Sequence, residues 1–252
     1  MQKILEFIWK NHDVARATIG YDDRLKVCVF QIVSVLSAIV LLVTSSCTVK
    51  AQHSGKENGH EYIDLGLSVK WATCNVGAAS PEEYGDYYAW GETWTKPDYG
   101  PKTNKHFNGS IFDINKYNTK KNSGTVDNKT TLEPVDDVAH VNWGGSWRMP
   151  TMDELVELLE NCTWTWTVQK DVAGYLVKSK KTGYEEASIF LPAAGLKSFT
   201  DLEDQGSHGY YWSGSLYVGM TDRAWDLRFS SDSHKKSYDG RSAGRSVRPV
   251  CP

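Results

Sequence analysis

The stretch that decides the fold runs from Pro150 to Val168 and reads PTMDELVELLENCTWTWTV. Thr151 and Glu154 have the spacing of a capping box, in which the threonine caps the first turn and the glutamate bonds back to its amide. Four apolar side chains then recur at helical spacing, namely Leu155, Val156, Leu158 and Leu159. After Asn161 the pattern changes to strict alternation of polar and apolar residues. The stretch therefore predicts a helix that packs on an apolar partner, followed directly by a strand.

Short strands are predicted on both sides of this helix. Each is a run of alternating or β-branched and aromatic residues bounded by Gly, Pro, Asn or Asp, at 62–67, 69–74, 174–177, 188–191, 210–215, 224–230 and 246–250. Residues 102–131 are rich in Asn, Lys, Thr and Gly and are typical of a long loop. One clear helix among many short strands and long polar loops indicates an α+β domain.

The overall composition argues against two classes of protein, intrinsically disordered chains and nucleic-acid-binding proteins. The chain has 252 residues, 40% hydrophobic and 23% charged, which is a globular composition. Its 28 Lys and Arg against 31 Asp and Glu leave a net charge of −3, so no basic face for a nucleic acid is expected. The 10 Trp and 13 Tyr favour a β-rich domain or a recognition surface.

The N-terminal part has the organisation of an export signal. Residues 27–43 carry no charge, Arg24 and Lys26 precede them, and small residues follow. This pattern is typical of a secretory signal. The apolar run is also close to the shortest length that spans a bilayer, so a retained membrane anchor is the alternative.

The residues after the apolar run suggest how the chain is held after export. Thr44-Ser45-Ser46-Cys47 resembles a bacterial lipobox, although that motif usually has Leu where Thr44 stands. We expect Cys47 to be lipidated, with cleavage after Ala51 as the alternative. The expected organisation is an export segment over residues 1–46, a tether over 47–60 and a domain over 61–252. The protein would then be an outer-membrane lipoprotein on either the periplasmic or the cell-surface side.

Three further cysteines follow Cys47. In an oxidising compartment, an odd set of three suggests one disulfide and one unpaired thiol. We expect Cys74 to pair with Cys162, because Cys251 lies next to a terminus that can fray. The alternative is that all three are unpaired.

Motifs for catalysis or resident cofactors are missing from the sequence. Neither His nor Cys residues have zinc-ligand spacing, and there is no nucleophile elbow or phosphate-binding loop. We therefore expect no catalytic residues, no resident metal and no cofactor. Five loop acids could gather around calcium, but their spacing does not favour it over ordinary solvation; they are Glu82, Glu83, Asp86, Asp136 and Asp137.

The C-terminal part contains the candidate binding residues. Residues 225–230 alternate apolar and polar, which predicts a half-buried strand with Asp226, Arg228 and Ser230 facing outward. The surrounding residues are of the types that make adaptable recognition surfaces, namely Tyr217, Asp222, Arg223, Ser231, His234, Tyr238 and Arg241. The alternative is an ordinary solvated sheet face of the same composition.

Six phrases, in order, resemble one family. They are YIDLGLSVKWATCNVG (62–77), YAWGET (88–93), WGGSWRMPT (143–151), LPAAG (191–195), GYYWS (209–213) and SVRPV (246–250). Over about residues 61–252 the chain is similar to the Fibrobacter succinogenes major paralogous domain, which occurs in secreted proteins and lipoproteins of Bacteroides relatives.

This resemblance implies a C-type-lectin-like fold, shared with formylglycine-generating enzymes and with the variable proteins of diversity-generating retroelements. In those variable proteins the C-terminal strands and loops bind the ligand. The resemblance therefore implies a glycan- or protein-binding face made of Tyr217, Asp222, Arg223, Asp226, Arg228, Ser231, His234, Tyr238 and Arg241. It implies support from beneath by Trp212, Trp225, Leu227, Phe229 and Val247.

Two other functions are compatible with the same resemblance. Residues 147–151 resemble the helix entry of formylglycine-generating enzymes, which bind copper through a cysteine pair near their end. This chain has only Cys251 there, and a single thiol is a poor Cu(I) site. The second alternative is a structural or tip subunit of a surface fibre. The favoured interpretation is an exported, lipid-anchored binding protein without enzymatic activity.

Overall fold

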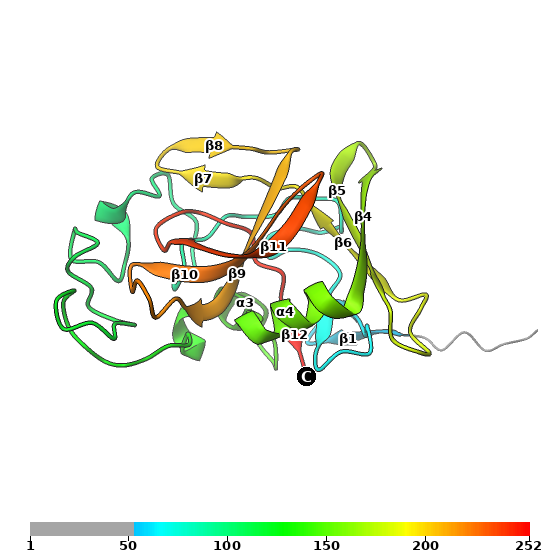
Figure 1. Ribbon diagram of the computed structural model, residues 1–252, viewed down its shortest axis with the longest axis horizontal. Coiled ribbons are helices and arrows are strands. Elements are labelled where there is room, and N and C mark those ends of the chain that lie inside the picture. Colours follow the sequence, from blue (N-terminus) through cyan, green and yellow to red (C-terminus); the bar gives the residue numbers. More distant parts are fainter. Residues whose placement is uncertain (1–52) are drawn as a thin grey trace, which may run out of the picture. The chain divides into compact units, whose positions relative to one another are not determined.

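The computed structural model describes residues 53–252, which belong to one compact unit. The export segment expected over residues 1–46 and the lipidation position Cys47 lie outside the described residues. Within the described part, four small antiparallel sheets and two α-helices confirm an α+β architecture that is mostly β (Figure 1). None of the helices between residues 53 and 252 has the length and apolar character required to cross a bilayer.

The first sheet joins the two ends of the domain, in the order β1-β2-β3-β12. Its strands are β1 (Ser54–Glu57), β2 (His60–Ile63), β3 (Lys70–Ala72) and β12 (Val250–Cys251). The expected tether up to residue 60 is therefore wrong from residue 54 onward. Asn58 and Gly59, both with positive φ, make the tight turn that pairs β1 with β2. Polar composition alone did not reveal this hairpin.

The helices of the described part of the chain lie between residues 101 and 161. Two are short 3₁₀ turns, η1 (Pro101–Thr103) and η2 (Pro134–Asp136), and two are α-helices, α3 (Val138–Trp143) and α4 (Met152–Asn161). The predicted capping box of α4 is confirmed: Thr151 Oγ1 accepts from the Glu154 amide at 3.2 Å, and Glu154 accepts from the Thr151 amide at 2.8 Å. Helix α3 was not predicted, because its start depends on Asp137, whose carboxylate accepts from two amides of the first turn.

The second sheet follows α4 directly, as its sequence predicts. It has the order β4-β5-β6, from β4 (Cys162–Gln169), β5 (Val172–Ser179) and β6 (Ser188–Pro192). Lys170 and Asp171, both with positive φ, form the two-residue turn between β4 and β5. Trp164 and Trp166 pack with Tyr175 toward the core, so the alternating threonines of β4 face outward.

The third sheet carries most of the candidate binding residues. Its order is β11-β10-β9, from β9 (His208–Leu216), β10 (Arg223–Ser230) and β11 (Ser233–Gly240). Strand β11 was not predicted, since its polar sequence has no alternation; it is an exposed edge strand. A small fourth sheet consists of β7 (Leu196–Ser198) and β8 (Asp201–Glu203), and of the expected strand at 246–250 only its end, in β12, is a strand.

Two apolar clusters form most of the core. One lies between α4 and the strands and includes Leu155, Leu158, Tyr211, Leu227 and Phe229. The other is rich in tryptophan and includes Trp90, Trp147, Trp212 and Val247. The residues expected to lie beneath the binding face are thus buried, except Trp225, which is half-buried.

The cysteines correct one expectation. Cys74, Cys162 and Cys251 are all free thiols, so the expected Cys74–Cys162 disulfide is not formed. The reason is their placement: Cys162 belongs to the α4 cluster, whereas Cys74 and Cys251 pack in the tryptophan-rich cluster. Burial raises the pKa of all three thiols, that of Cys162 to about 11.

Candidate functional site

Strands β10 and β11 divide the candidate binding residues between two faces of their sheet. Residues directly opposite each other in an antiparallel pair point to the same side. Trp225 lies opposite Tyr238, so these two side chains share one face. Asp226 lies opposite Ser237, and they share the other. The single outward face expected from the sequence is therefore two faces with different surroundings.

An aromatic group lies at one end of the first face. The rings of Tyr217 and Tyr238 are stacked, with centroids 3.9 Å apart and an interplanar angle of 7°. Trp225 meets both edge-on, at 4.8 Å from Tyr217 and 5.7 Å from Tyr238. Tyr238 is 36% exposed, and the other two side chains are half-buried. We call Tyr217, Trp225 and Tyr238 the aromatic surface cluster.

Charged and apolar side chains surround this cluster. The Arg223 guanidinium lies 5.8 Å from the centre of the Tyr238 ring, and Asp222 is 3.9 Å from Arg223. Lys236 lies 5.9 Å from the Trp225 ring, and Val218 and Met220 in the neighbouring loop are about half exposed. A planar apolar surface with donors and acceptors at its margin can stack on a ligand and orient it.

The hydroxyl groups of the cluster can serve as donors. A side-chain hydrogen bond with Tyr238 raises the pKa of Tyr217 further above the neutral range, where a phenol is already protonated. The structure brings together four of the candidate binding residues, namely Tyr217, Asp222, Arg223 and Tyr238. Lys236 was not among the candidates, because it reaches Trp225 only through the unexpected strand β11.

Three further candidates lie on the surface but away from the cluster. Arg228 is exposed on the opposite face, where its guanidinium lies 5.0 Å from the Tyr210 ring. Ser231 is exposed in the turn between β10 and β11. His234 stacks on Trp164 at 4.9 Å, and partial burial lowers its pKa.

Asp226 is buried, which contradicts its expected outward position. Its side chain is fully inaccessible and forms an ion pair with Arg245, which is 1% exposed. Arg245 also pairs with Asp239 at 2.5 Å and lies 4.5 Å from the Trp212 ring. The segment that carries Arg245 continues to Ser246, which bridges to the edge of β9, and from this edge the Arg245 side chain reaches Asp226 on the face of the sheet.

Arg241 is also buried, and it ties the end of β11 to the long loop. Its guanidinium donates to the carbonyl groups of Tyr117 at 3.3 Å, Thr221 at 3.0 Å and Lys116 at 3.1 Å. The Trp90 ring centre lies 4.8 Å from it. Burial lowers the pKa of Arg241. Arg241 is therefore a structural residue that no ligand can reach from the surface.

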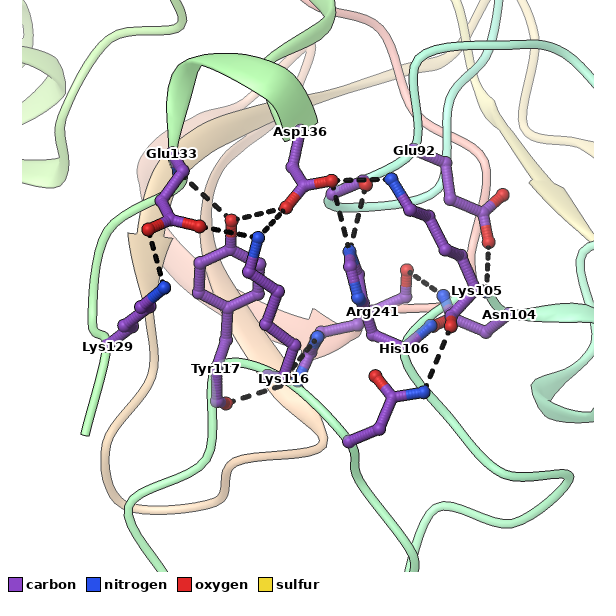
Figure 2. Close-up of polar contacts among 12 residues, drawn as sticks. Glu92, Asn104, Lys105, His106, Lys116, Tyr117, Lys129, Glu133, Asp136 and Arg241 are labelled. Carbon is purple, nitrogen blue, oxygen red and sulfur yellow. Dashed lines mark hydrogen bonds and ion pairs between the residues drawn. The ribbon is translucent and has the colours of Figure 1, made fainter. Parts of the chain in front are cut away.

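A charge network around Asp136 surrounds Arg241 (Figure 2). The Asp136 carboxylate is 2% exposed and contacts Lys105 and Lys116, each at 2.5 Å, and the Tyr117 hydroxyl at 2.6 Å. Burial alone would raise the pKa of Asp136, but the hydrogen bonds from these three partners outweigh it and hold the pKa far below the usual range. Burial raises the pKa of Tyr117 to about 12, so the hydroxyl remains a donor to Asp136.

His106 is the histidine of this network. Its Nε2 lies 3.1 Å from the Gly91 carbonyl and 3.8 Å from Asp136. Burial, followed by the charge of Arg241, lowers its pKa to about 4. The residue is therefore neutral at pH 7, and its partners are internal groups, which makes the network a structural support for the loop.

The five acids considered for calcium do not form one site. Asp136 is neutralised by lysines, and Asp137 accepts from backbone amides at the start of α3 and from the Met149 amide at 2.8 Å. Glu82 pairs with Lys170 at 3.2 Å. In residues 53–252, no three His, Cys, Asp or Glu side chains converge as metal ligands would.

No protein-family model, curated protein or solved structure matches this chain.

Proposed function

We propose that the chain is an exported, lipid-anchored binding protein without catalytic activity, and that the aromatic surface cluster recognises a glycan or protein ligand. The proposal includes a C-type-lectin-like fold for the domain and lipidation at Cys47. The motifs between residues 62 and 250, the uncharged run at 27–43 and the lipobox-like residues 44–47 support these parts.

One observation carries the proposal: Tyr217 and Tyr238 are stacked at the surface, with Trp225 against their edges. Tyrosine and tryptophan are enriched at recognition surfaces, because each ring supplies a large apolar contact area together with a polar group. Arg223 and Asp222 beside the rings add directional hydrogen bonds. Stacking on a sugar ring or on a planar peptide group uses the same geometry.

The oxidase alternative is less favoured by the chemistry of the thiols. Copper binding requires thiolates, and burial raises the pKa of Cys251, which favours the neutral thiol. The fibre-subunit alternative has no residue-level support of its own, and it becomes the better explanation only if no ligand is found.

The test is a binding screen of the domain on glycan and protein arrays, with and without a chelator. Tyr238→Ala should weaken the binding of any ligand found by at least about tenfold, which corresponds to about 1.4 kcal/mol. Phe199→Ala is the matched control, because Phe199 is an exposed aromatic residue elsewhere on the domain, at 59%.

Each outcome of the screen has a distinct meaning. Loss of binding in Tyr238→Ala but not in Phe199→Ala supports the aromatic surface cluster. Binding that depends on Arg228 instead would move the site to the opposite face. A folded domain that binds nothing on either array would favour the fibre subunit, and the chelator arm would establish whether calcium contributes.

A further inference from the structure

The edge strands of the sheets differ in what keeps them from pairing with a strand of another molecule. An unprotected edge strand exposes backbone N–H and C=O groups that can pair with another strand. Three edges are covered by the chain itself: Ser246 bridges to β9, Arg148 bridges to β12, and Gly244 pairs with Lys197 of β7. These edges have no backbone groups to offer to a partner.

Other edges are protected by charge or by side chains. Strands β1 and β8 each carry two charged residues and β11 carries three, and charges at an edge discourage pairing. The outer side of β6 is occupied, since its Phe190 and Pro192 carbonyls accept hydrogen bonds from Arg248 and Tyr211. Only the edge of β4 remains to be accounted for among the strands between residues 53 and 252.

Strand β4 has none of these protections. It is eight residues long, carries no charge and pairs with β5 in unbroken register. Within the described part of the chain, no hydrogen bond reaches the backbone of residues 163–169 except from β5. Thr163, Thr165 and Val168 are exposed along it. The combination of threonine, tryptophan and valine has high β-propensity, so the strand is well suited to pair with a further strand on the side opposite to β5.

We propose that β4 pairs in antiparallel fashion with β4 of a second copy of this chain, around a two-fold axis at Thr165. Symmetric pairing is the commonest way in which identical chains associate. This register would place Thr163 opposite Thr167 of the other copy and Trp164 opposite Trp166. The outward face of the joined strands would then present threonines from both copies, and the core-facing side would present tryptophans. Cross-strand threonine pairs and aromatic pairs both stabilise a sheet. The two three-stranded sheets would become one sheet of six strands.

The sequence of β4 itself favours a second copy over an unrelated strand. Residues 163–167 read Thr-Trp-Thr-Trp-Thr, which is the same in both directions about Thr165. In the antiparallel register centred on Thr165, threonine therefore faces threonine and tryptophan faces tryptophan, a match that an unrelated strand would not provide.

The test is the self-association of the full chain in a mild detergent, measured by sedimentation over a range of concentrations. We expect the parent chain to form a dimer. Thr165→Lys and Thr165→Glu should each weaken dimerisation by about tenfold or more, because two like charges meet at the axis. Thr182→Lys, at an exposed turn position away from β4, adds the same charge and should leave the dimer unchanged.

Mixing the two charged variants separates loss of pairing from loss of folding. An equimolar mixture of Thr165→Lys and Thr165→Glu should recover the dimer, since opposite charges then meet at the axis. Recovery in the mixture supports the proposal. A parent chain that remains monomeric, a dimer that persists in Thr165→Lys alone, or a mixture that stays monomeric would overturn it.

Discussion

Asp226 and Arg245 form an ion pair in which neither side chain is more than 1% exposed. Taking both charges out of water costs free energy, which their attraction offsets only with good additional contacts. Here Asp239 provides a second carboxylate for Arg245, and the Tyr210 and Trp212 rings lie at 5.0 and 4.5 Å from the guanidinium. The pair ties the segment after β11, which runs along the edge of β9, to the β9–β10–β11 sheet.

Removal of Asp226 should therefore destabilise the domain. In Asp226→Ala, Arg245 stays buried with only the half-exposed Asp239 as a partner, and a loss of about 3 kcal/mol in the free energy of unfolding is expected. Urea denaturation measures this change. Arg228→Ala, two residues further along the same face but exposed, should change the free energy by no more than about 0.5 kcal/mol. Equal effects from the two substitutions would contradict the buried ion pair.

Arg248 should not tolerate replacement by lysine. It is 1% exposed, and its guanidinium donates to Asn75 Oδ1 and Phe190 O, each at 2.9 Å, and to the carbonyls of Ala72 and Thr73. A lysine cannot reproduce this planar set of donors. Arg248→Lys should cost about 3 kcal/mol of unfolding free energy, measured by chemical denaturation. An unchanged denaturation midpoint would show that these contacts do not hold the sheets together.

His106 should make the domain sensitive to mild acid. Its pKa is lowered from 6.5 to about 4 in the folded state, so below pH 6.5 the unfolded chain binds a proton that the folded chain does not. The resulting stability loss develops as the pH falls from about 6.5 to about 4, and amounts to about 2 kcal/mol between pH 7 and pH 5. Urea denaturation at these two pH values measures it.

The matched comparison for this effect is His106→Gln, which has no proton to gain. Its stability should change less between pH 7 and pH 5 than that of the parent chain, by about the same 2 kcal/mol. His60 and His234 also have pKa values lowered by burial and contribute to the pH dependence of both proteins. The contribution of His106 is therefore the difference between the parent chain and His106→Gln in how much the free energy of unfolding changes from pH 7 to pH 5. An identical pH dependence would show that His106 is hydrated or protonated in the folded chain.

The thiols should be accessible to alkylation without prior reduction. In the denatured chain, peptide mapping should find Cys74, Cys162 and Cys251 all modified, because none is in a disulfide. In the folded chain Cys74 should react first, since it is half-buried whereas the other two are no more than 2% exposed. A linked peptide that contains Cys74 and Cys162 would restore the pairing expected from the sequence.

Local patterns predicted the local structure well. The capping box at Thr151 and the alternation after Asn161 correctly placed α4 and β4, because the periodicity of a helix or strand depends on neighbours in the chain. The strands expected at 174–177 and 188–191 lie within β5 and β6, and Leu227 and Phe229 were correctly assigned to the core. Strand β11 was missed, because it is held by pairing with β10 and has no pattern of its own.

The sequence by itself determined the α+β class, the one strong helix and the residue types along β10, since these follow from composition and short-range spacing. Only the tertiary structure decided which of those residues reach the surface. Alternation assigns Asp226 to a face of β10, but Arg245, from a later segment, covers that face. Arg241 is likewise enclosed by the long loop through the carbonyls of Lys116 and Tyr117. A polar residue at the surface of its own strand is buried when a distant part of the chain supplies its partners, and spacing along the sequence does not record that contact.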